Sequence, residues 1–245
     1  MGLGRFIGPG AVIIALLALI VSLIKAPRKR PFILSLGALL VSGGMFGRLL
    51  AIGAQAAGLP PIHDVQTDWT NPIMFSEAMM EIRKNDGAMN SVEAAPVIKL
   101  PGSASDRWPG FDGKLVAEAQ EMTEQDPAKA GEDDKEKLYP PINTLTISKP
   151  KAEVLAAVKT LVEERGWDIV TEELGDMDET GVIEATHTSG WFGFKDDVAI
   201  HVLSGANGES IVDMRSISRV GLSDLGANAK RVGNFLSDLR RVTAN

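Results

Sequence analysis

The sequence predicts an α+β protein in which two N-terminal transmembrane helices precede an antiparallel sheet with two helices packed on one face. Three observations support this prediction. Two long apolar stretches lie within the first 56 residues. Two later segments carry apolar residues at helical spacing, and short β-branched segments lie before and between them. Their order, β-α-β-β-β-β-α, is typical of an antiparallel sheet with helices on one side.

The two apolar stretches cover residues 6–24 and 32–47. The first is about as long as the roughly 20 residues that cross a hydrocarbon core. The second spans only if it continues through Ile52, with Arg48 extending towards the headgroups. The loop between them carries four positive charges: Lys25, Arg28, Lys29 and Arg30. Short loops rich in Lys and Arg stay in the cytoplasm. We therefore expect a multi-pass protein of a bacterial inner membrane whose later residues face the periplasm, with the opposite orientation as the alternative.

Charge and composition separate this anchor from the rest of the chain. Six of the 25 basic residues and none of the 32 acidic residues lie in the first 56 positions, which leaves 19 basic against 32 acidic residues and a net charge of −13. Phosphate backbones repel such a surface, so we expect no nucleic-acid partner. The absence of cysteine excludes disulfides, thiolate catalysis and cysteine metal sites. We expect no cofactor and no metal.

We divide the chain into three regions. Residues 1–56 form the two-helix anchor, residues 57–138 an irregular, partly helical segment that ends in an acidic linker, and residues 139–245 the α+β domain. In the middle region, residues 75–83 have a short helical pattern. Residues 117–137 hold eight acidic and three basic residues, which is typical of a solvated helix or a flexible linker.

Two helices are expected in the C-terminal region. The first follows Pro150 and ends at Gly166, and its apolar positions form one stripe: Val154, Leu155, Val158, Leu161 and Val162. The second covers about residues 224–241, and its apolar positions repeat in the same way: Leu225, Ala229, Val232, Leu236 and Leu239. Ser223 or Asp224 can cap its N-terminus.

Five strands are expected around these helices, at about residues 142–147, 167–172, 181–188, 195–203 and 209–216. The last two are joined by a three-residue loop, 206–208, with a glycine at its left-handed position. This loop fixes a register that pairs Val202 with Val212 and Ile200 with Met214 on one face, and His201 with Asp213 and Ala199 with Arg215 on the other.

The densest polar stretch runs from the end of the last strand to the start of the last helix. Together with a neighbouring strand it contains nine candidate residues: Asp196, Asp197, Arg215, Ser216, Ser218, Arg219, Asp224, Asn228 and Arg231. One interpretation is an anion or carboxylate pocket at the helix N-terminus. The other is a structural network in which the three aspartates pair the three arginines, and we favour it because such pairs fix geometry without implying catalysis.

Three segments resemble the bacterial family called domain of unknown function 1499 (DUF1499): residues 191–198, 215–219 and 224–231. The resemblance covers roughly residues 60–245. It implies a membrane-anchored bacterial member, because membrane segments ahead of the domain also occur in that family. Its members have no assigned activity, so the resemblance implies no mechanism.

No catalytic site is predicted. The three histidines are far apart, without the spacing of a zinc site. His201 and Asp213 resemble a base with its orienting carboxylate, but the sequence places no nucleophile beside them. An ordinary cross-strand ion pair explains them more simply.

The remaining candidates are aromatic. Trp191, Phe192 and Phe194 form either a lip that faces a lipid or protein partner or, as we favour, a small core that closes the sheet. The function that the sequence favours is a non-catalytic binding or assembly module of the cell envelope. Its expected partners are the lipid bilayer and an envelope protein or a second copy of the chain. The alternatives are a lipid- or small-ligand-binding domain and, third, a hydrolase-like enzyme that uses His201 and Asp213.

Overall fold

The computed structural model describes residues 14, 16–17, 20–21, 29–57, 59–122, 142–175, 180–190 and 192–244. The chain forms two compact units, Met1–Gly58 and Leu59–Asn245.

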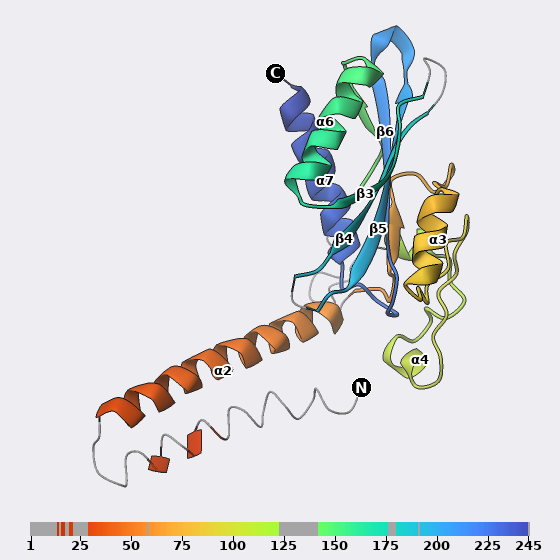
Figure 1. The fold of residues 1–245 in the computed structure, drawn as a ribbon. Coiled ribbons are helices and arrows are strands. Elements are labelled where there is room, and N and C mark those ends of the chain that lie inside the picture. Colours follow the sequence, from red (N-terminus) through yellow and green to blue (C-terminus); the bar gives the residue numbers. More distant parts are fainter. Residues whose placement is uncertain are drawn as a thin grey trace, which may run out of the picture. The chain divides into compact units, whose positions relative to one another are not determined.

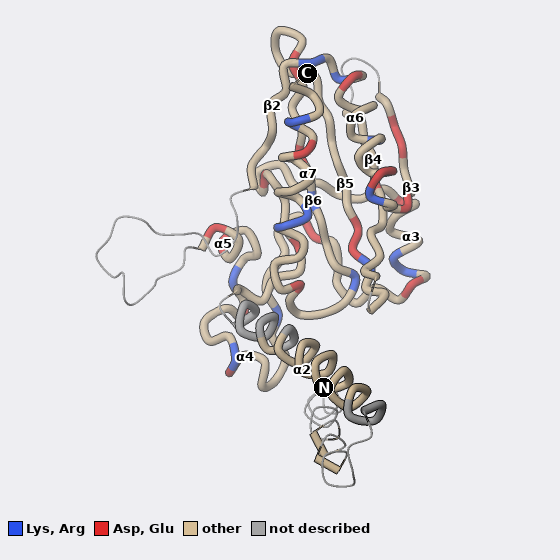
Figure 2. Tube along the Cα trace, turned by 90° about the vertical axis from the view of Figure 1, so that its left-hand side faces the viewer, with Lys and Arg blue, Asp and Glu red and all other residues tan. Residues whose placement is uncertain are grey.

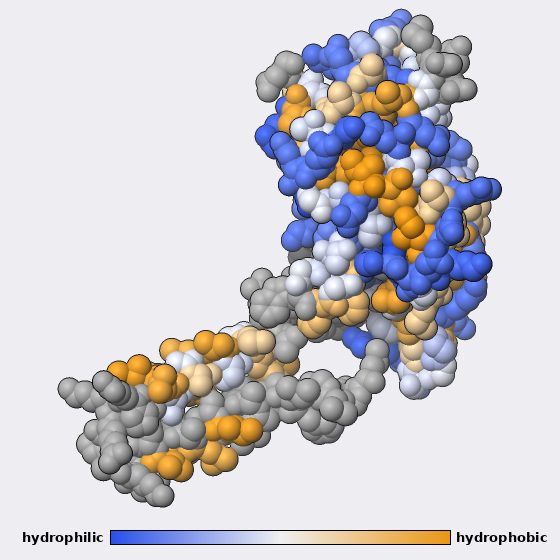
Figure 3. Space-filling view, in the orientation of Figure 1, coloured by the Kyte–Doolittle hydropathy of each residue, from blue (hydrophilic) through white to orange (hydrophobic). Residues whose placement is uncertain are grey.

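The first unit contains helix α2, Lys29–Ala57. Several of its large apolar side chains are exposed: Ile33, Leu34, Leu40, Val41, Met45 and Leu50. Figure 3 shows these apolar residues in orange. Five glycines, two serines and Arg48 interrupt them. No helix within the described residues is long and apolar enough to cross a membrane, so the second predicted span is not found there.

Much of the sequence from which the membrane orientation is predicted lies outside the described residues. Most of the first apolar stretch is not described, nor are Lys25 and Arg28. Lys29 and Arg30 form the start of α2.

The second unit is built on one antiparallel sheet in the order β1-β6-β5-β4-β3, with β2 also pairing β6. The strands are β1 (Asp64–Gln66), β2 (Leu145–Ile147), β3 (Asp168–Glu173), β4 (Gly181–Thr188), β5 (Lys195–Ser204) and β6 (Ser210–Ser218). The predicted α+β class is confirmed. Strand β1 was not predicted.

The register of the β5–β6 hairpin is confirmed. Val202 pairs with Val212, Ile200 with Met214, His201 with Asp213 and Ala199 with Arg215. The connecting turn, η2 (Ala206–Gly208), has positive φ angles at Asn207 (57°) and Gly208 (78°). Asparagine and glycine tolerate this conformation, which explains how so short a connection reverses the chain.

Two long helices, α6 (Lys151–Glu164) and α7 (Ala227–Thr243), cover one face of the sheet (Figure 1). All five predicted apolar positions of α6 are buried. Helix α7 begins at Ala227, so Leu225 lies before it and is exposed. Phe235, which the stripe did not include, is fully buried and stacks on Trp167 with 5.6 Å between ring centres.

The opposite face, here called the outer face, is partly covered by helix α3 (Glu77–Asn85), as Figure 1 shows. A small apolar cluster forms beneath it: Ile73, Phe75, Met79, Ala199 and Ile217. Two further short helices are α4 (Ala104–Arg107) and α5 (Val116–Gln120). The outer face therefore carries both apolar contacts and the buried charges described next.

Candidate functional site

Arg215 lies on the outer face and is fully buried. Its guanidinium binds the Asp64 carboxylate through Nε–Oδ1 at 3.0 Å and Nη2–Oδ2 at 2.6 Å. It also donates to the carbonyl oxygens of Ile73 at 2.5 Å and Glu93 at 2.8 Å, and lies 5.5 Å from the centre of the Trp69 ring. All three nitrogens are thus engaged within the protein. Arg215 ties β1 and two loops to β6.

Asp197, next along this face, is fully buried between two arginines. Arg219 binds it through Nε–Oδ2 at 2.9 Å and Nη2–Oδ1 at 2.7 Å, and Arg83 of α3 pairs with the same carboxylate. The Thr186 hydroxyl donates to Oδ1 at 2.9 Å. Arg219 also pairs with Asp86, just after α3. This cluster fastens α3 to the sheet, and Figure 2 shows positions of both signs along α3 and β5.

A second polar cluster joins α7 to the ends of β5 and β6. Arg231 Nη2 binds Asp196 Oδ2 at 2.5 Å, and its Nη1 binds Ser216 Oγ at 2.9 Å. The Ser216 hydroxyl donates to Asn228 Oδ1 at 2.7 Å, and Asn228 Nδ2 donates to Ser218 Oγ at 3.0 Å. Each of these polar groups has a partner in the domain, as a structural network requires.

Asp224 occupies the N-terminus of α7. Its Oδ1 accepts the backbone N–H of Gly226 and its Oδ2 that of Asn228, both at 2.8 Å. No ion pair to Asp224 is found in the described part of the chain, and burial raises the pKa of this carboxyl to about 6. The N–H groups that an external anion would use are therefore taken by Asp224. This geometry favours the structural interpretation over the anion pocket.

His201 and Asp213 face each other across β5 and β6 but do not form a hydrogen bond. Asp213 Oδ1 instead accepts hydrogen bonds from the hydroxyls of Thr67 at 2.7 Å and Thr144 at 2.5 Å. Burial lowers the pKa of His201, so its imidazole is neutral at pH 7. The pair lacks the contact that orients a catalytic base. Across the described residues, no group of three or more His, Asp or Glu could hold a metal ion.

The aromatic candidates do not form a closed core. Phe192 is 71% and Phe194 55% exposed, and the two rings stack at 5.7 Å. Trp191 lies outside the described residues. The small-core interpretation is therefore wrong for the two phenylalanines.

These phenylalanines lie in the turn between β4 and β5, at the end of the sheet where β6 ends. Three further exposed apolar residues belong to segments at this end: Met89, Val220 and Leu225. We call these five residues the apolar rim. The chain enters the domain at the same end, because the carbonyl oxygen of Ile62 accepts the N–H of Asp224 at 3.0 Å. The Met89 N–H donates to Arg219 O at 2.8 Å, which joins the loop after α3 to this end of the sheet.

Sequence reasoning missed three members of the buried network. Asp64 pairs with Arg215, and Arg83 pairs with Asp197. Glu184, also buried, accepts from both the N–H (2.7 Å) and the hydroxyl (2.5 Å) of Ser76, the N-cap of α3. The sequence carries one signal for the buried charges of the outer face. Glu184 is a charged residue at a strand position whose side chain is buried.

Comparison with curated proteins finds no match. Residues 64–239 match the family described as "Protein of unknown function (DUF1499)". The match begins at Asp64 and so includes the Asp64–Arg215 pair, α3, α6 and α7 as far as Leu239. This chain is a member of the DUF1499 family.

Proposed function

We propose that this chain is a membrane-anchored, non-catalytic binding or assembly module of the bacterial cell envelope. Residues 1–58 attach it to the inner membrane, and the domain that begins at Leu59 faces the periplasm. Support for attachment comes from the apolar stretches of the sequence and from the exposed apolar side chains of α2. The orientation rests on the four basic residues between the stretches.

A binding role is favoured over catalysis because the buried charges are engaged with one another. Arg215, Arg219 and Arg231 each bind a carboxylate within the domain. The His201–Asp213 pair lacks the contact that a base needs. What the domain presents to its surroundings is the apolar rim.

The single observation that carries the proposal is the exposed, stacked pair Phe192 and Phe194. The aromatic surface that remains exposed on this stacked pair costs free energy in water, and aromatic residues are enriched at protein interfaces. The rim lies at the end of the domain where Ile62 leads the chain into it.

The orientation can be tested with single cysteines, since the chain has none. Asn207→Cys places a thiol at the exposed β5–β6 turn. We expect a membrane-impermeant maleimide to label it in intact spheroplasts. Labelling only after lysis would contradict the periplasmic placement.

The binding role can be tested by photo-cross-linking in the full-length chain. A photoreactive phenylalanine at position 192 should give one discrete cross-linked product in cells, and Phe194→Ser should abolish it. The same group at position 207, at the opposite end of β5, is the control and should give none. Equal products at both positions would contradict a specific rim interface. A small molecule that co-purifies with the full-length chain would favour the ligand-binding alternative.

A further inference from the structure

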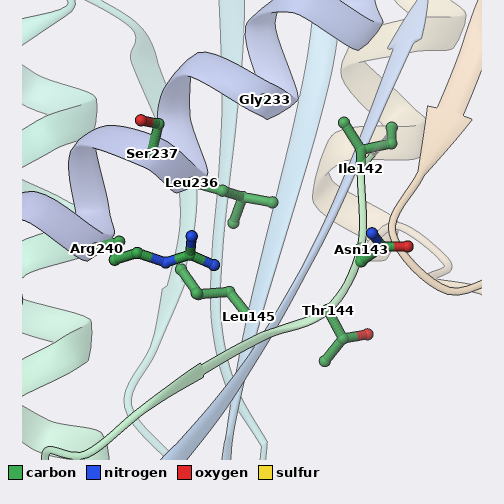
Figure 4. A pocket seen from close by; sticks show the side chains of 8 residues that line it. All are labelled: Ile142, Asn143, Thr144, Leu145, Gly233, Leu236, Ser237 and Arg240. Carbon is green, nitrogen blue, oxygen red and sulfur yellow. The ribbon is translucent and has the colours of Figure 1, made fainter. Parts of the chain in front are cut away.

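A small pocket lies between β2 and the C-terminal half of α7. Its volume is about 270 Å³. Ile142, Leu145 and Leu236 supply its apolar lining, and one stripe of α7 forms its wall: Gly233, Ser237 and Arg240, at i, i+4 and i+7. Figure 4 shows the side chains of Leu236 and Arg240 from the helix and of Leu145 from β2 converging on one another. The pocket shares no residue with the apolar rim.

Arg240 supplies an unused positive charge at this pocket. Its side chain extends across the pocket towards Leu145 (Figure 4). No hydrogen bond or ion pair of its guanidinium is found among the described residues. The next residue, Arg241, differs, because it pairs with Asp238 at 2.9 Å. A guanidinium beside an apolar surface is suited to bind a carboxylate whose own stem is apolar.

The open edge of β2 adjoins the pocket. Thr67 N–H donates to Met214 O at 3.0 Å, so the even-numbered residues of β6 direct their backbone groups towards β1 and β2. Leu145 and Ile147, opposite Val212 and Ser210, therefore take the ladder bonds. The N–H and C=O of Thr146 point away from the sheet, and neither has a partner in the part of the chain that is described.

The neighbouring edge strand shows what a closed edge looks like here. In β1 the corresponding groups are those of Gln66, which donates its N–H to Gln120 Oε1 at 3.2 Å and accepts from Gln120 Nε2 at 2.8 Å. The Gln120 amide thus takes the place of a further strand. Thr146 of β2 has no such cover, although unpaired edges are usually covered or blocked.

We propose that the β2 edge and the α7 pocket bind an extended acidic segment of a partner polypeptide by strand addition. The partner backbone pairs with the N–H and C=O of Thr146. One of its apolar side chains enters the pocket against Leu145 and Leu236, and a carboxylate pairs with Arg240. The site shares no residue with the apolar rim, so it names a partner class for the proposed binding role without depending on membrane attachment.

The acidic character of the domain makes this proposal specific. A net charge of −13 past residue 56 repels acidic peptides in general. Any such binding must therefore come from a local site. An apolar and an acidic residue two positions apart fit it, because both side chains then lie on the side of the added strand that faces the pocket and Arg240.

The test uses the full-length chain in mild detergent and two short labelled peptides. One repeats valine-threonine-glutamate-threonine, so that valine and glutamate share one side of the strand, and the other has lysine in place of glutamate. We expect saturable binding of the glutamate peptide only, measured by fluorescence anisotropy. Arg240→Glu should weaken it about tenfold or more. Gly233→Leu should do the same by filling the pocket, and it should fold, because the nearest atom to an added Cβ is Ile142 Cγ2 at 3.8 Å.

Arg241→Glu is the matched control, because it makes the same charge change one residue away and outside the pocket. It should change the affinity by less than about twofold. Equal losses for Arg240→Glu and Arg241→Glu would overturn the site in favour of diffuse electrostatics. Hydrogen exchange then tests the geometry: the peptide should protect the Thr146 amide, and unchanged exchange there would overturn strand addition. A different outcome would also overturn the proposal. If the parent chain binds no peptide but self-associates, and Gly233→Leu abolishes the self-association, the occupant of the site is a second copy of the chain.

Discussion

The two faces of the sheet are stabilised by different physics. Beneath α6 and α7 the contacts are mainly apolar, with fully buried residues such as Val158, Phe235 and Leu239. The polar cluster around Arg231 is confined to the N-terminal half of α7 and the ends of β5 and β6. Beneath α3, the outer face instead buries charged side chains, among them Arg215 and Asp197, which are fully buried. Apolar burial has no direction and tolerates exchange between residues of similar volume. Buried charges need particular partners at particular positions, so the outer face specifies how α3 and β1 dock.

The largest expected effect comes from breaking the outer face at Asp197. Asp197→Ala leaves the buried guanidiniums of Arg83 and Arg219 without their shared carboxylate. Losing one partner of a buried ion pair costs about 3–5 kcal/mol. Chemical denaturation of the full-length chain, followed by tryptophan fluorescence, would measure it.

An exposed pair provides the control for that experiment. Lys159 and Glu172 pair at 2.7 Å with both side chains partly in solvent. Glu172→Ala should cost less than about 1 kcal/mol. A similarly small loss for Asp197→Ala would mean that water solvates the outer-face network and that it does not fasten α3.

A slightly smaller effect is expected on the helix-covered face. Leu239→Ala removes a fully buried side chain and should cost about 2–5 kcal/mol. Leu239→Met conserves volume and should cost less than about 1.5 kcal/mol. Asp197→Asn, a replacement of equal size, should stay costly because it removes the charge. If both conservative replacements were tolerated equally, the two faces would not differ as proposed.

The sequence predicts the helix-covered face far better than the outer face. A stripe of five apolar residues predicted the buried side of α6, and a three-residue turn with alternating residues predicted the β5–β6 register. Both patterns are local in sequence, and each repeats with the period of its secondary structure, about 3.6 residues in a helix and two in a strand. The Arg215–Asp64 pair joins residues 151 positions apart, and ion pairing leaves no periodic signal. Strand β1 has three residues, too few to show alternation.

The candidate site follows the same division. Asp224 was one of two residues expected to cap the start of α7, and its carboxylate does accept the N–H groups of Gly226 and Asn228. The partners of the arginines depend on tertiary structure. Exposure of Phe192 and Phe194 was also beyond the sequence, because the same aromatic spacing suits a core or a surface.

Asp224 provides the smallest expected effect and extends the comparison to a carboxylate without an arginine partner. Burial raises its pKa from an ordinary value near 4 to about 6. The folded protein therefore binds more protons than the unfolded chain between about pH 4 and pH 6. The stability from the protonated form is complete below pH 4 and is lost as the pH rises through 6, by no more than about 3 kcal/mol.

The measurement is the difference in unfolding free energy between the parent chain and Asp224→Asn at several pH values. The variant cannot titrate at this position, so the difference isolates the carboxyl. The parent should lose stability relative to the variant as the pH rises from 4 to 7. A pH-independent difference would mean that the N–H groups of Gly226 and Asn228 stabilise the charged carboxylate as fully as an arginine would.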